Sequence, residues 1–180
     1  MAETSPPGSS STSPPEHDDA SPAPLAVRTI PNEDTVSRHI FAPRMIGPAA
    51  EFVWAEVFQF PASEGLAESV AWRAVASSDS EVHSLGCDKQ ARDRARAEAK
   101  GQTGPTYRGF INANVGAIRS QRVTSGHRFS VTHAPAEGDW HGEVAVVLAA
   151  GTTKLSKQDK QDVRAIMEEV FGNLNAHTCP

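Results

Sequence analysis

The chain has 180 residues and a formal net charge of −5, and 38% of its residues are hydrophobic. This length fits one domain with an appended tail. The mild acidity argues against a protein that binds nucleic acid with its whole surface. No apolar run approaches the roughly 18 residues that would span a bilayer, so no membrane segment is expected. The two cysteines, Cys87 and Cys179, have no partner at metal-ligand spacing. This predicts that no structural disulfide forms and that the protein is cytoplasmic.

The N-terminal stretch consists almost entirely of Ser, Pro, Thr, Ala, Glu and Asp. Such a segment buries too little apolar surface to offset its ordering entropy. We therefore predict a disordered tail over residues 1–30, a single domain over 31–174, and a frayed end over 175–180. The stretch lacks the basic and apolar regions of a signal peptide, and it serves as a solubilising tail or as a partner-binding motif.

Three segments in the first half predict strands or short elements. Arg38–Phe41 is typical of a short strand, which Pro43 would end. The run over residues 51–60 is rich in large apolar side chains and predicts a strand, with Pro61 after it. The segment over residues 67–76 suits either a short strand or a turn of helix.

A polar helix is predicted to begin at Asp79 or Ser80, because either residue can cap a helix. The following residues to Lys100 are mostly good helix formers with almost no large apolar side chain, which indicates a solvated helix that Gly101 ends. Residues 107–121 then predict a buried strand that turns into a short helix capped by Asn112 or Asn114.

The clearest pairing signal is a hairpin over residues 127–148, where apolar and polar residues alternate on both sides of a turn that contains Pro135 and Gly138. A capping box at Ser156 and Asp159 opens a final amphipathic helix. Together these elements predict an α+β fold, with a mainly antiparallel sheet, a polar mid-chain helix and a C-terminal packing helix.

The candidate catalytic residues are Asp139, His141 and Glu143, with His133 on the preceding strand. On an extended backbone, positions 139, 141 and 143 project from one face. His with a carboxylate can act as an acid–base pair or bind a divalent metal. The alternative is an ordinary polar strand face, which we favour because no complete metal or catalytic motif is present. No metal or other cofactor is predicted.

The candidate binding residues begin with Arg38 and His39, since Arg can hold a phosphate or a carboxylate with two hydrogen bonds. A solvated strand end is the alternative. Ser69 lacks the GxSxG turn that would expose a nucleophile. Cys87 has no adjacent base and is expected to be inert.

A basic stretch follows, in which Arg92, Arg96 and Lys100 recur every four residues and so lie along one helical face. It could contact phosphates or an acidic protein, or it could simply be a solvated helix. Trp140 completes the binding candidates. The basic residues of the stretch are Lys89, Arg92, Arg94, Arg96, Lys100, Arg108, Arg119, Arg122 and Arg128.

Several short motifs resemble a loosely defined group of small uncharacterised bacterial proteins. They are Arg38–Phe41, Phe58, the Glu68-Ser69-Val70 region, the run from Ala136 to Gly142, and the Ser-capped last helix. The resemblance covers roughly residues 33–172. The resemblance implies one domain and a special role for His141, but it does not indicate an enzymatic activity.

These observations favour a non-catalytic bacterial accessory protein that docks on a larger protein assembly. One alternative is a small hydrolase or nucleic-acid-processing enzyme that uses His141 with Asp139 or Glu143. Another is an RNA- or DNA-binding module that uses the basic stretch from Lys89 to Arg128.

Overall fold

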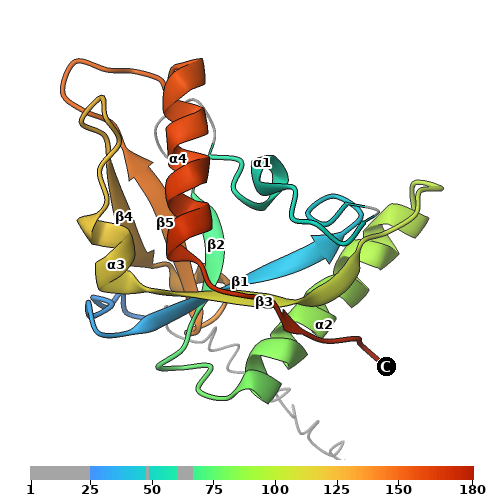
Figure 1. Cartoon of the computed structure of the whole chain (residues 1–180). Coiled ribbons are helices and arrows are strands. Elements are labelled where there is room, and N and C mark those ends of the chain that lie inside the picture. The colour runs from blue at the N-terminus through green and yellow to red at the C-terminus, as the bar shows by residue number, and fades with distance from the viewer. Residues whose placement is uncertain (1–24, 48, 61–66) are drawn as a thin grey trace, which may run out of the picture.

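A computed structural model describes residues 25–47, 49–60 and 67–180 (Figure 1). Most of the predicted N-terminal tail lies outside these residues. The elements, in chain order, are β1 (Thr35–Ala42), α1 (Trp54–Val57), β2 (Glu68–Trp72), α2 (Asp79–Glu98), β3 (Thr106–Asn114), α3 (Val115–Ser120), β4 (Arg128–His133), a 3₁₀ turn (Pro135–Glu137), β5 (His141–Val147), α4 (Lys157–Val170) and β6 (Asn175–Ala176).

The strands form one antiparallel sheet in the order β4-β5-β2-β1-β3-β6. Helix α2 lies along β3 on one side of this sheet, and α4 stands against the other side (Figure 1). Val163 and Met167 of α4, and Phe171 directly after it, are buried in the main apolar core. Because its sheet is antiparallel and its helices pack on both faces, the protein has the predicted α+β fold.

Several predicted elements are confirmed. Strand β1 ends just before Pro43, β4 and β5 pair as a hairpin, and Asn114 caps α3 after the buried strand β3. The capping box of Ser156 and Asp159 opens α4 as expected. Local signals that combine a cap with an apolar period therefore located these elements well.

The strand predicted over residues 51–60 is wrong, because a short helix, α1, takes its place. Trp54, Val57 and Phe58 follow helical spacing, and the rings of Trp54 and Phe58 stack within this turn. Phe58 in turn packs on Phe171, at the end of α4. Contact with α4 thus outweighs the strand propensity of the aromatic residues.

Helix α2 is the predicted polar helix, but its N-cap is Ser78 rather than Asp79 or Ser80. The Ser78 side chain accepts a hydrogen bond from the Glu81 backbone, and the Glu81 carboxylate accepts one from the Ser78 backbone. This reciprocal pair is a capping box. It fixes the start of the helix, and only a narrow stripe, Val82, Gly86 and Gln90, is buried against the sheet.

The C-terminus differs from the frayed end that the sequence predicts. Asn175 and Ala176 pair with β3, and Cys179 forms a disulfide with Cys87 of α2. The prediction that no structural disulfide forms is therefore wrong. The fold brings Cys87 and Cys179 together although they lie far apart in the sequence. Their spacing in the sequence does not reveal such a contact. Among the described residues, no helix is both long and apolar enough to cross a membrane.

Candidate functional site

Three adjoining hollows follow the side of α2 that faces the sheet, and we call them together the α2 groove. The first, of about 420 Å³, lies between α2 and the segment before β5. The second, of about 350 Å³, lies between α2, β1 and β2. The third borders the C-terminal end of α2, and Asp93 lines all three. The charged side chains of the groove are Arg38, Arg44, Glu68, Lys89, Arg92, Asp93, Arg96, Lys100 and Glu137.

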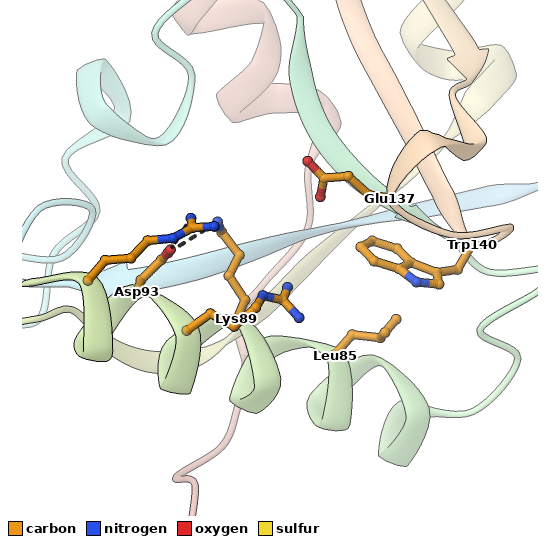
Figure 2. A pocket seen from close by; sticks show the side chains of 7 residues that line it. Leu85, Lys89, Asp93, Glu137 and Trp140 are labelled. Carbon is orange, nitrogen blue, oxygen red and sulfur yellow. Dashed lines mark ion pairs between the residues drawn. The ribbon is translucent and has the colours of Figure 1, made fainter. Parts of the chain in front are cut away.

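The first hollow has one aromatic wall and one charged wall. Figure 2 shows Trp140 next to Leu85, with Glu137 further along and Lys89 and Asp93 rising from α2. Trp140 also packs on the small apolar cluster formed by Ala76, Val82 and Phe110. An apolar wall facing cations suits a ligand that carries both an apolar group and negative charge.

Six basic side chains and three carboxylates line the α2 groove. Asp93 forms ion pairs with Lys89 at 3.1 Å and with Arg96 at 3.5 Å. Arg92 and Lys100 make no ion pair with any other described residue. Lys89, Arg92, Asp93 and Arg96 are spaced by three or four residues and so project from the same side of α2, whereas Lys100 follows the end of the helix. The α2 groove is therefore a positively charged surface.

Arg38 holds together the part of the sheet where β1 and β2 diverge. The two strands pair only at Val36–Trp72 and Ser37–Ala71. Beyond that point the Arg38 guanidinium donates to the carbonyls of Ser69 (2.8 Å) and Val57, and it forms a close ion pair with Glu68. Burial lowers the pKa of Arg38 from its ordinary value, which the Glu68 carboxylate opposes. Most of its donors are thus occupied within the protein.

His39 lies on the sheet face toward α2, where its Nε2 donates to the carbonyl of Val82 at 3.0 Å. Burial lowers the pKa of His39 to about 4, and the neighbouring Arg38 and Lys89 charges act in the same direction. The ring is therefore neutral at physiological pH. It lines the second hollow as an uncharged group.

His141 makes two short hydrogen bonds across the strands. Its Nδ1 lies 2.7 Å from the carbonyl oxygen of Ala134, and its Nε2 lies 2.8 Å from the hydroxyl oxygen of Ser69. In β5 it pairs with Ala71, so Ser69 is two residues further along on the same face. The side chain of His141 is buried, with 5% exposed.

His133 lies on the opposite face of the sheet from His141. In the antiparallel pairing His133 faces Gly142, the residue next to His141, and neighbouring residues of a strand point to opposite faces. Its Nδ1 accepts from the Arg28 backbone at 3.0 Å, and its ring packs on Trp72. The predicted meeting of His133 and His141 does not occur.

Contrary to the sequence prediction, Asp139 does not project from the same strand face as His141 and Glu143. It precedes β5, forms an ion pair with Arg28 at 2.6 Å, and has a carboxylate oxygen 3.5 Å from His133 Nε2. Only His141 and Glu143 share a strand face, because only they belong to β5. In the described part of the chain, no group of three His, Cys, Asp or Glu side chains could hold a metal ion.

The structure thus divides the predicted site residues into two groups. All six binding candidates line the α2 groove: Arg38, His39, Arg92, Arg96, Lys100 and Trp140. The four catalytic candidates separate, with His133 and Asp139 on one side and His141 and Glu143 on the other. Ser69 lacks the sequence motif of a nucleophile, and no pattern in the sequence links it to His141.

Comparisons with protein-family models, with curated proteins and with solved structures find no match to this chain.

Proposed function

We propose that the protein is an interaction protein that binds an acidic segment of a protein partner in the α2 groove, as an accessory part of a larger assembly. The observation that carries this proposal is the gathering of Lys89, Arg92 and Arg96 beside Trp140 and Leu85 in the first hollow. Negative side chains of a partner would pair with the guanidinium groups, and an apolar side chain would pack on the indole. Aromatic and Arg side chains dominate many protein interfaces for this reason.

A protein partner suits the groove better than a nucleic acid. Three carboxylates, Glu68, Asp93 and Glu137, lie among its cations. Evenly spaced phosphates would meet repulsion at each of them, whereas a peptide can place neutral or basic residues there. RNA or DNA binding is therefore the less favoured alternative. The binding experiment described next tests it as well.

The test uses a fluorescently labelled peptide that contains glutamates around one leucine, with binding followed by fluorescence polarisation. Reversing two charges, in Arg92→Glu/Arg96→Glu, should weaken binding by about tenfold, since each exposed ion pair contributes up to about 1 kcal/mol. Raising the salt concentration should weaken binding to the wild type more than binding to the variant.

The matched control is Lys154→Glu/Lys157→Glu. Lys157 is the first residue of α4 and Lys154 lies just before the helix; both are exposed and neither lines the α2 groove. This control changes the net charge by the same amount and should leave the affinity within twofold. An equal loss of peptide affinity in both variants would mean that net charge alone attracts the peptide. It would refute binding in the α2 groove. Tighter binding of a labelled single-stranded RNA than of the peptide would favour the nucleic-acid alternative.

We also propose that the protein works in an oxidising compartment rather than in the cytoplasm predicted from its cysteine spacing. The Cys87–Cys179 disulfide supports this, because cytosolic thiols are kept reduced in most organisms. Thiol labelling of the protein in its native cells, with and without reductant, tests the proposal. If both thiols were fully labelled without reductant, the proposal would be wrong and the protein would belong to a reducing compartment.

A further inference from the structure

We propose that Ser69 is a nucleophile, that His141 is its general base, and that this pair hydrolyses small carboxylic esters in the second hollow of the α2 groove. This activity goes beyond partner binding and depends on different residues. Its basis is the 2.8 Å separation of the Ser69 hydroxyl oxygen and His141 Nε2. A nucleophile within hydrogen-bond reach of a base that a third group orients is the arrangement used for acyl transfer.

The hydrogen bonds of His141 fix which ring nitrogen carries the proton. The carbonyl oxygen of Ala134 can only accept, so His141 Nδ1, 2.7 Å away, must be the donor. The Nε2 of the neutral ring then has a free electron pair that accepts the proton of the Ser69 hydroxyl. The backbone carbonyl takes the orienting position that an aspartate holds in other serine hydrolases.

Ser69 is accessible from the second hollow, and His141 lies buried behind it. Ser69 is half-buried and lines this space of about 350 Å³, which suits a small acyl group. The hollow exists because β1 and β2 diverge there, and the Arg38 guanidinium fixes the Ser69 carbonyl at 2.8 Å. Lys89 lines the same hollow, so its positive charge would help to stabilise a developing oxyanion.

The reaction balances with water as the second reactant. The Ser69 oxygen bonds to the acyl carbon while its proton passes to His141 Nε2, and the leaving alkoxide takes that proton as the ester bond breaks. Water then gives a proton to Nε2, and its oxygen attacks the acyl carbon. The carboxylic acid leaves, and Ser69 recovers its proton from Nε2.

The experiment combines covalent labelling with turnover on the full chain. An alkyl fluorophosphonate should add to Ser69 with loss of fluoride, as read by intact mass and peptide mapping. p-Nitrophenyl acetate should be hydrolysed by the wild type. Ser69→Ala should abolish both, and His141→Asn should slow both by about 100-fold or more, because general-base catalysis contributes at least that factor.

Ser130→Ala is the matched control, since Ser130 is also a half-buried strand serine but has no side-chain hydrogen bond among the described residues. Ser130→Ala should keep full labelling and turnover. Circular dichroism establishes that each variant is folded. A folded wild type that is neither labelled at Ser69 nor active, or a His141→Asn variant that labels at the wild-type rate, would overturn the proposal. The labelling and turnover assays contain no acidic peptide, so failure of this proposal is distinguished from failure of peptide binding in the α2 groove.

Discussion

His39 shows how one buried side chain makes stability depend on pH. Its pKa is lowered from 6.5 to about 4 in the folded protein, chiefly by burial. The unfolded chain therefore binds more protons than the folded protein between these values. Stability from the neutral ring is complete above pH 6.5 and is lost as the pH falls toward 4. The shift corresponds to a loss of about 3 kcal/mol at most.

We predict that His39→Gln removes this part of the pH dependence, because glutamine can still donate to the Val82 carbonyl but does not titrate. Urea unfolding of wild type and variant between pH 7 and pH 4 measures it. The free energy of unfolding should fall more steeply for the wild type. Parallel curves for the two proteins would contradict the buried, neutral state of His39.

For single residues, the sequence indicates which side chains can take part in chemistry better than it indicates the side chains that they contact. Strand alternation correctly puts His141 and Glu143 on one face, since both belong to β5. It fails for Asp139, which lies in the turn and pairs with Arg28. The partner of His141 is Ser69, 72 residues away in sequence, and only the pairing of β2 with β5 joins them. Local patterns contain no information on such a long-range contact.

Packing between α2 and β3 depends on the absence of a side chain at Gly86. A Cβ atom there would lie 2.3 Å from Cζ of Tyr107, a ring that is completely buried. Mid-helix glycine normally costs about 1 kcal/mol relative to alanine. The close approach of the helix to the strand explains why glycine is nevertheless suited to this position.

We predict that Gly86→Ala destabilises the protein by about 1–3 kcal/mol, because the overpacking cost exceeds the gain in helix propensity. Chemical denaturation monitored by circular dichroism measures the change. Ser84→Ala, on the exposed side of the same helix, is the control and should shift stability by less than about 0.5 kcal/mol. A Gly86→Ala protein as stable as the wild type would refute the tight helix–strand contact.

The elements that sequence reasoning located are those with local signals, and those it missed depend on tertiary contacts. The capping box of α4 and the run of helix-forming residues in α2 are local signals, although the N-cap of α2 is Ser78 and not the predicted Asp79 or Ser80. Helix α1 has no capping side chain, and its aromatic residues pack on α4. A segment of this kind cannot be assigned without knowing what covers it.

For the whole molecule, the disulfide joins the segment that follows β6 to helix α2. Cys87 lies on α2, and Cys179 follows β6, which pairs with β3 through only two residue pairs, at Gly109 and Phe110. So short a strand contributes little by itself. The covalent link therefore holds the C-terminus against the helix that forms the α2 groove.

We predict that Cys87→Ser/Cys179→Ser lowers the free energy of unfolding by about 2–5 kcal/mol, because a disulfide that closes so long a loop restricts the unfolded chain. Urea unfolding with and without reductant measures it. Reductant should destabilise the wild type to the level of the double variant and leave the variant itself unchanged. Hydrogen exchange should rise first at β6, whose pairing the disulfide supports. If reductant left the wild-type transition unchanged while mass spectrometry showed both thiols free, the disulfide would not be a structural element of this fold.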